Sequence, residues 1–209
     1  MTILDSIIAN KIKEVELRIK AFPQTFWEQS PWFDREVFSL SQGLKNSPTG
    51  IIAEHKRRSP SLDNINSSLS IHQVAQDYQK AGVSGVSVLT DQKYFGGSLE
   101  DLTAARAECQ IPILRKEFII DPYQLFEAKA HGADIILLIA AVLDREQIKQ
   151  LSQTAKSLGL EVLLEVHNQE ELNKALMPSL DMIGVNNRNL KTFEVSLETS
   201  MALAEFIPN

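Results

Sequence analysis

Short apolar runs alternate with amphipathic segments over most of the chain, from about residue 50 to residue 206. The runs are rich in β-branched residues and leucine and lie at 50–55, 83–90, 111–118, 134–141, 160–166 and 181–187. The segments with helical spacing lie at 71–81, 98–108, 121–131, 144–158, 168–177 and 196–206. Strands that are almost continuously apolar need cover on both faces, which is typical of a parallel sheet flanked by helices. The pattern therefore predicts an α/β protein.

Two α/β architectures fit this alternation, an open doubly wound sheet and a (β/α) barrel. The run at 50–55 is not followed by the glycine-rich phosphate turn that a dinucleotide-binding sheet has after its first strand. Charged and amide residues stand instead at the carboxyl ends of several runs, which share one rim in a barrel. These residues are Glu54, Lys56, Lys116, Glu165, Asn186 and Arg188. We therefore expect a barrel of the (β/α)8 type, of which about six βα units are present.

The spacing of these residues predicts which way their side chains point. Residues two apart on a strand share a face, so each polar residue has a same-face neighbour two positions away. The pairs that can face the barrel interior are Glu54 with Lys56, Leu114 with Lys116, Leu163 with Glu165, and Asn186 with Arg188. His55 and Arg115 then face the helices. Lysines and glutamates that converge in this way perturb one another's pKa values, as general acid–base chemistry requires.

Composition narrows the classes of partner. The net charge of −6 argues against a nucleic acid or an anionic membrane, because both need a broad positive surface. The longest apolar run, 135–143, falls far short of the roughly 20 residues that span a bilayer. A single cysteine, Cys109, and charge by position 5 without an apolar leader favour the cytoplasm. The remaining histidines lack the spacing of a metal site, so no metal is expected.

The first 48 residues precede the barrel and predict a helical extension that packs on it. Thr2 is placed as an N-cap with Asp5 three residues later, the spacing of a capping box. Apolar residues at positions 4, 7, 8, 12, 15 and 19 are expected on one helical face. We expect one domain overall, with the extension at 1–48 and the partial barrel at 49–209.

Several segments together resemble the indole-3-glycerol phosphate synthase family, over about residues 50–205. They include "IIAEHKRRSPS", "GVSVLTDQKYFGGSLEDL", "IPILRKEFIIDPYQLFEAKAHGADIILLIAAVL", "LGLEVLLEVHNQEEL" and "IGVNNRNLKTFEVSLETS". The resemblance implies ring closure and decarboxylation of 1-(2-carboxyphenylamino)-1-deoxyribulose 5-phosphate in tryptophan biosynthesis. It also implies a phosphorylated small-molecule substrate and no cofactor. The N-terminal extension of the family packs against the barrel and helps to close the mouth of the active site.

The resemblance implies catalytic roles for five residues. Lys116 is expected to be the general acid that protonates the substrate ketone, and Glu165 the base for a later proton removal. Glu54 and Lys56 would orient the intermediate and balance its charge, and Asn186 would hold a substrate hydroxyl.

The same resemblance implies a substrate-binding set around these groups. Arg188 would hold the carboxylate side of the substrate, and Ser59 with Pro60 would line the mouth. The apolar walls around the aromatic ring would be Phe95, Phe118, Leu137 and Leu190.

The chain departs from the family pattern in two places. The family usually has an apolar or aromatic residue at the position of His55, where we expect a change in packing only. The sequence also stops where a seventh strand is expected, whereas a complete barrel has about 250 residues. The loops after the last two strands, which form the phosphate site of the family, would then be absent. We therefore expect weak activity and self-association or limited stability, because the two outer strands are open edges.

Two alternatives remain at this level. The chain could be a non-catalytic barrel fragment that associates with a second copy to close its sheet. The neighbouring pathway enzyme, phosphoribosylanthranilate isomerase, is also a barrel, but it uses a cysteine at the end of its first strand and an aspartate on its sixth. Here the first strand carries Glu54 and Lys56, and Cys109 lies ahead of the third.

Overall fold

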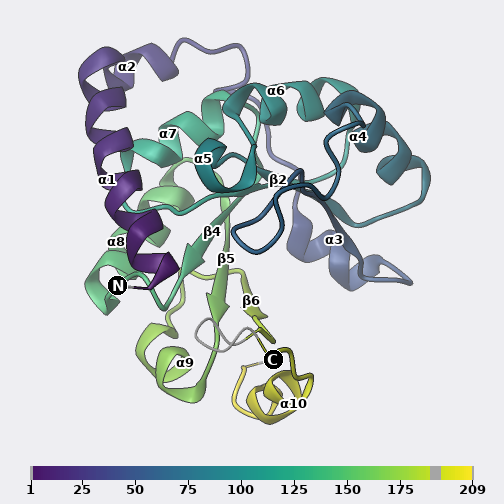
Figure 1. Cartoon of the computed structure of the whole chain (residues 1–209), viewed down its shortest axis with the longest axis vertical. Coiled ribbons are helices and arrows are strands. Elements are labelled where there is room, and N and C mark those ends of the chain that lie inside the picture. Colours follow the sequence, from purple (N-terminus) through teal and green to yellow (C-terminus); the bar gives the residue numbers. More distant parts are fainter. Residues whose placement is uncertain (1, 189–193, 209) are drawn as a thin grey trace.

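The computed structural model describes residues 2–188 and 194–208. One sheet contains six strands, all parallel and in the order of the sequence. The strands are β1 (Ile52–His55), β2 (Gly85–Leu89), β3 (Ile113–Lys116), β4 (Ile135–Ile139), β5 (Glu161–Val166) and β6 (Met182–Val185). Each lies within a predicted run, and helices cover the outside of the curled sheet (Figure 1). The barrel-type prediction with six βα units is therefore confirmed.

A helix follows each strand, as the spacing of apolar residues predicts. The helices are α4 (Ile71–Lys80), α6 (Leu99–Glu108), α7 (Tyr123–Ala130), α8 (Arg145–Ser157), α9 (Gln169–Ala175) and α10 (Glu198–Ala204). Four of them begin at a side chain that accepts a backbone N–H of the first turn, namely Ser70, Ser98, Asp144 and Asn168. The sequence did not predict three shorter helices, α2 (Gln24–Trp27), α3 (Leu40–Asn46) and α5 (Gln92–Phe95). Two of them, α2 and α5, have four residues each, about one turn, which is too short for periodicity to be visible.

The N-terminal helix α1 (Ile3–Ala21) begins as predicted, because Thr2 and Asp5 form a capping box. Its buried face differs from the prediction. The fully buried residues are Ile7, Lys11 and Val15, whereas Ile12 and Ile19 are 45% and 41% exposed. A charged residue therefore takes a place in the buried stripe, and two of the apolar residues face outward.

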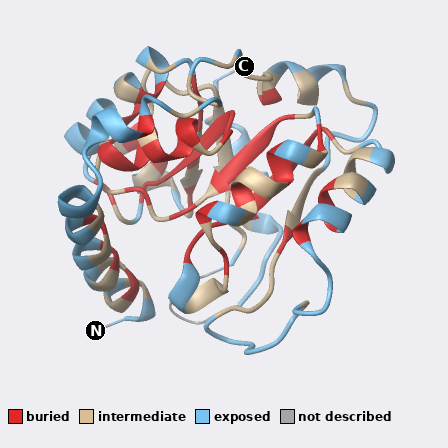
Figure 2. Cartoon of the chain, turned by 90° about the horizontal axis from the view of Figure 1, so that it is seen from above, coloured by how far each residue is buried: buried red, intermediate tan, exposed pale blue. Residues whose placement is uncertain are grey.

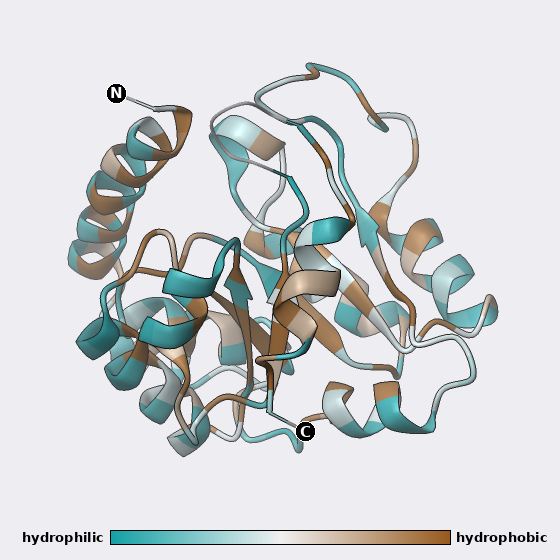
Figure 3. Ribbon diagram, turned by 90° about the horizontal axis from the view of Figure 1, so that it is seen from below, coloured by the Kyte–Doolittle hydropathy of each residue, from teal (hydrophilic) through white to brown (hydrophobic). Residues whose placement is uncertain are grey.

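The two faces of the sheet belong to two different clusters of apolar residues. Ile113, Ile136 and Leu138 pack outward against the helices. Leu114 and Leu137 pack inward in a smaller cluster. The predicted alternation of side chains along β3 is thus confirmed, and β4 alternates in the same way. Figure 2 shows the buried residues concentrated on the strands and on the inner faces of helices, and Figure 3 shows hydrophobic strands between hydrophilic outer helix faces.

The amino ends of the strands are covered by α3. Leu40 is fully buried in the inner cluster, and a Cβ added to Gly85 at the start of β2 would lie 2.7 Å from its side chain. The Glu161 carboxylate at the start of β5 accepts the backbone N–H groups of Leu40 (2.8 Å) and Ser41 (3.0 Å). Burial alone would raise the pKa of Glu161, but these and the serine hydroxyl hydrogen bonds lower it. The carboxyl ends of the strands are therefore the ends that α3 does not cover.

Candidate active site

A cavity of about 660 Å³ lies at the carboxyl ends of the strands. Every predicted site residue within the described part of the chain lines it. These residues are Glu54, Lys56, Ser59, Pro60, Phe95, Lys116, Phe118, Leu137, Glu165, Asn186 and Arg188. Leu190 lies outside the described residues. The structure therefore brings residues from β1, β3, β4, β5 and the segment after β6 to one place, while their catalytic and binding roles stay predictions.

Lys116 and Glu165 face each other across this cavity. The Lys116 ammonium at the end of β3 lies 3.2 Å from Glu165 Oε2 on β5, and the side chains are 29% and 15% exposed. The Asn186 amide, just after β6, donates to Glu165 Oε1 at 3.0 Å. Burial by itself would raise the pKa of Glu165, but Lys116 and Asn186 outweigh it and lower that pKa. Glu165 is therefore a carboxylate at neutral pH, able to accept a proton beside an ammonium able to give one.

A second lysine–glutamate pair comes from β1 and the residue that follows it. Lys56 Nζ lies 2.9 Å from Glu54 Oε1, and Ser87 Oγ donates to Glu54 Oε2 at 3.1 Å. Ser87 reaches Glu54 because the two residues are direct partners in the register of β1 and β2. The cavity thus contains two lysine–glutamate pairs, Lys56 with Glu54 and Lys116 with Glu165.

Aromatic rings form one wall of the cavity. Phe95 and Phe118 have centroids 6.0 Å apart with their planes tilted by 38°. Phe95 ends the short helix α5, and Gly96 follows in a left-handed conformation with φ of 71°. A Cβ at Gly97 would lie 1.9 Å from the Leu89 carbonyl oxygen, so glycine is required there. The "YFGGS" stretch is therefore a turn that places Phe95, with Ser98 as the N-cap of the next helix.

The loop after β1 is anchored by two arginines, Arg57 and Arg58. Arg57 makes two contacts with the Asp101 carboxylate, at 2.5 and 2.8 Å. Arg58 donates to the carbonyl oxygens of Gln92 and Lys93. These contacts hold the loop that brings Ser59 and Pro60 to the cavity.

His55 and Arg115 point away from the cavity, as strand parity predicted. His55 is 5% exposed, and burial lowers its pKa. Arg115 is 1% exposed and binds Glu127 of α7 at 3.2 Å. His55 is therefore a packing residue in this fold.

Several apolar residues that line the cavity were not predicted from the sequence. Ile3, Leu4 and Ile7 of α1 lie at its edge, as do Leu62 and Ile65 in the loop after β1. The amphipathic pattern of α1 indicates that it must dock somewhere, but periodicity does not identify the surface against which a helix docks.

Residues 2–188 and 194–208 contain no group of three or more histidine, cysteine, aspartate or glutamate residues that could hold a metal ion. No helix in these ranges combines the length and the apolar character needed to cross a bilayer.

Replacing His167 by alanine should raise the pKa of Glu165. His167 Nε2 lies 3.6 Å from Glu165 Oε1, and this imidazole is one of the groups that lower the pKa of Glu165. A carboxyl with a lowered pKa stabilises the fold above its unfolded pKa and loses that contribution as the pH falls through its folded pKa. The variant should therefore protonate Glu165 at a higher pH than the parent, measured by ¹³C NMR titration of the carboxyl. The exposed His72, replaced in the same way, should leave the titration unchanged; an unchanged titration in the His167 variant would contradict the prediction.

Comparison with known proteins agrees with this geometry. The family model described as indole-3-glycerol phosphate synthase matches residues 4–209. A protein of that name from Bacteroides thetaiotaomicron is 47% identical over 206 residues, covering 99% of this chain and 79% of the relative. A second, from Polynucleobacter asymbioticus, is 48% identical over 172 residues, covering 82% of this chain and 64% of the relative. The two lysine–glutamate pairs and the aromatic wall thus occur in a sequence that matches one family along almost its whole length, and this chain belongs to the indole-3-glycerol phosphate synthase family.

Proposed function

We propose that this chain is a carbon–carbon lyase that converts 1-(2-carboxyphenylamino)-1-deoxyribulose 5-phosphate into indole-3-glycerol phosphate for tryptophan biosynthesis. Family membership supports the reaction. The Lys116–Glu165 pair is the observation that supports assigning this reaction to particular residues. Asn186 binds the same carboxylate, and the aromatic wall of Phe95 and Phe118 lines the same cavity. A cytoplasmic location is part of this proposal and is supported by a single buried cysteine.

Lys116 supplies the proton for ring closure. The ring carbon that bears the carboxylate forms a bond to the ketone carbon, and the ketone oxygen takes a proton from the Lys116 ammonium to become a hydroxyl. The bond from the ring to the carboxylate then breaks and releases carbon dioxide, which restores the electrons of the ring. An ammonium in this half-buried position also stabilises the charge that develops on the ketone oxygen.

Glu165 acts in the second half of the reaction. The new hydroxyl takes a proton from a lysine ammonium of the cavity lining and leaves as water, and the ring carbon beside the nitrogen loses a proton so that the five-membered ring becomes aromatic. The Glu165 carboxylate accepts that proton, because its lowered pKa keeps it ionised at neutral pH. The pair of Glu54 and Lys56 balances charge on the other side of the cavity.

The remaining residues bind the substrate. Phe95, Phe118 and Leu137 contact the aromatic ring, and Leu190 belongs to the same proposed wall. Arg188 and Asn186 hold the carboxylate and hydroxyl groups, while Ser59 and Pro60 line the mouth. All of these except Leu190 line the observed cavity, which supports the assignment.

The test of this function is direct turnover. The purified chain is incubated with the substrate, and formation of the indole ring is followed by its fluorescence. Ring formation that depends on the protein and is abolished by loss of Lys116 is expected; no turnover at any substrate concentration would overturn the proposal.

The isomerase alternative is not supported by the position of the cysteine. Cys109 follows α6 and is fully buried in the outer core, where burial raises the pKa of its thiol. It therefore lies outside the cavity lining, whereas the end of β1 contributes Glu54.

A non-catalytic, self-associating role has one structural observation in its favour. In the described sheet, β1 and β6 each pair with one neighbour only, so each has an open edge. We therefore expect the 209-residue chain by itself to form oligomers. Size-exclusion chromatography with light scattering measures this, and a stable monomer at high concentration would contradict it.

A further inference from the structure

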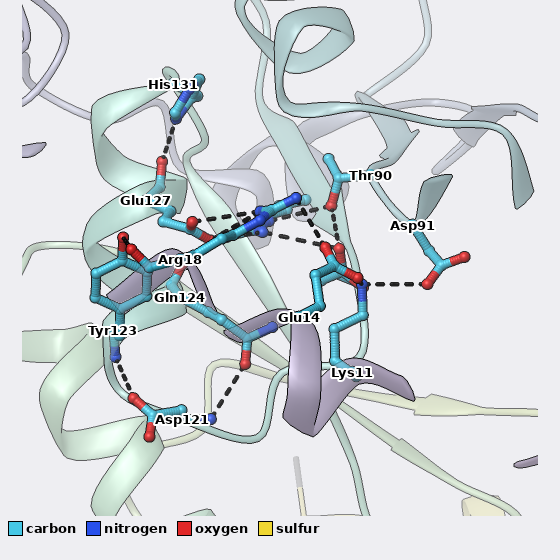
Figure 4. A network of polar contacts seen from close by, with 12 residues as sticks. Lys11, Glu14, Arg18, Thr90, Asp91, Asp121, Tyr123, Gln124, Glu127 and His131 are labelled. Atoms are coloured by element: carbon cyan, nitrogen blue, oxygen red, sulfur yellow. Dashed lines mark hydrogen bonds and ion pairs between the residues drawn. The ribbon is translucent and has the colours of Figure 1, made fainter. Parts of the chain in front are cut away.

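Lys11 is a buried lysine on the inner face of α1 that the reaction described above does not use. Its side chain is 1% exposed, and its ammonium lies 3.1 Å from Asp91 Oδ2, 3.1 Å from Glu117 Oε1 and 2.9 Å from Glu14 Oε2. Figure 4 shows it extending from its helix toward Asp91. Burial would lower the pKa of Lys11, but the three carboxylates outweigh it and raise that pKa. Removal of this ammonium would leave the buried Asp91 carboxylate without its ion pair, whereas Glu117 would keep Arg115 at 3.8 Å and Glu14 would keep Arg18 at 2.7 Å.

One partner, Asp91, caps the short helix that ends at Phe95. Asp91 follows β2 and is the N-cap of α5, with its Oδ1 accepting the Tyr94 backbone N–H at 2.8 Å. Its Oδ2 is buried and accepts no hydrogen bond within the described chain, which leaves it facing the Lys11 ammonium. Asp91 therefore joins Lys11 to α5, the helix that ends at Phe95 and that Arg58 also binds.

The other partner, Glu117, accepts a hydrogen bond from the backbone of Phe118. Glu117 directly follows β3 and stands between Lys116 and Phe118 in the sequence. Its side chain is fully buried. Glu117 Oε1 accepts the Phe118 backbone N–H at 2.8 Å as well as facing Lys11, and Oε2 accepts from Thr90 Oγ1 at 2.8 Å. Lys11 is thus linked through Glu117 to the backbone N–H of Phe118, two residues after Lys116.

Lys11 joins the two loops whose aromatic side chains form the wall of the cavity, with ring centroids 6.0 Å apart. We propose that Lys11 is a positioning residue for the reaction: by binding Asp91 and Glu117 together, it sets the spacing between Phe95 and Phe118. The link between the loops rests on geometry alone, and its effect on the substrate's aromatic ring rests on the proposed function. Because Lys11 is on α1, this contact also makes the site dependent on the docking of the N-terminal helix.

The same helix offers a matched control in Arg18. Arg18 binds Glu14 at 2.7 Å and the buried carboxylate of Glu127 on α7 at 3.3 Å. Its replacement removes one cation from the same network. Glu127 does not line the cavity and binds neither aromatic loop, so a purely structural role of the network predicts similar effects at Lys11 and Arg18.

Amide hydrogen exchange tests the link without relying on activity. In the full chain carrying Lys11→Met, the Tyr94 and Phe118 amides should exchange about tenfold faster than in the parent, because their acceptors lose the group that holds them. In Arg18→Met these two amides should change no more than the amides of β3. Equal acceleration of both amides in the two variants would overturn the proposal.

Kinetics test the consequence for the site. Lys11→Met should lower kcat/KM by about tenfold to a hundredfold, since displacement by about 1 Å can have an effect of this size, and KM should rise because the ring wall is loosened. Arg18→Met and the exposed Lys13→Met should stay within about threefold of the parent at a temperature where all variants are folded. If the parent chain itself does not turn over the substrate, the proposed function fails, while the exchange data still decide the role of Lys11.

A milder variant keeps the test available if Lys11→Met does not fold. Asp91→Asn retains the side-chain oxygen that caps α5 but weakens the ion pair with Lys11, leaving Glu14 and Glu117 in place. It should accelerate exchange of the Tyr94 amide and leave that of Phe118 unchanged. Unchanged exchange at Tyr94 would contradict the assignment of Asp91 to this link.

Discussion

Replacement of Lys116 by methionine should lower kcat by about 10²- to 10⁴-fold, the usual contribution of a general acid or base. Methionine fills a similar volume but has no proton to give to the ketone oxygen and no charge to stabilise it. The ammonium is 29% exposed and makes one ion pair, at 3.2 Å from Glu165, so its loss should leave the fold intact. Steady-state turnover measured by indole fluorescence gives the effect, and circular dichroism checks the fold.

The exposed Lys149 on α8 provides a matched control, because Lys149→Met removes the same charge far from the cavity lining. It should retain the activity of the parent. Activity of Lys116→Met within tenfold of the parent would show that another group supplies the proton, and Lys56 would be the next candidate because it also lines the cavity.

Replacement of Glu165 by glutamine should lower formation of the product by about 10²- to 10⁴-fold as well, but at a later step. Glutamine keeps the size and one oxygen of the side chain, yet it cannot accept the proton released when the ring becomes aromatic. Carbon dioxide leaves before that step. In a single turnover this variant should therefore release carbon dioxide while the indole fluorescence fails to develop, whereas Lys116→Met should show neither.

The exposed Glu170→Gln on α9 is the control and should behave as the parent. Simultaneous loss of carbon dioxide release and of fluorescence in Glu165→Gln would place this carboxylate in ring closure. The division of labour between the two residues would then be wrong.

Much of the fold could be predicted because the signals are local. Apolar runs and helical spacing identified the strands and the longer helices, and strand parity separated Lys116 from Arg115. Charged residues at strand ends indicated one rim, and the described candidates do line one cavity. Leu190, outside the described residues, remains untested.

The contacts that the sequence did not predict are long-range. Periodicity predicted an apolar face on α1 that included Ile12 and Ile19, both of which are exposed. It gave Lys11 no role, because a lysine in a helix is usually solvated unless paired. Its partners Asp91 and Glu117 follow two strands of the barrel and reach it only when the chain folds. Arg57 likewise has no local pattern that predicts a partner, and it binds Asp101 of α6.

The central claim is that Lys116, Glu165 and the wall of Phe95 and Phe118 act on one substrate in one cavity. A crystal structure of the chain with bound indole-3-glycerol phosphate tests it most directly. The indole ring is expected against Phe95 and Phe118, with the Lys116 ammonium and the Glu165 carboxylate both in contact with the ligand. An indole ring bound elsewhere, or a ligand that either side chain fails to reach, would contradict it.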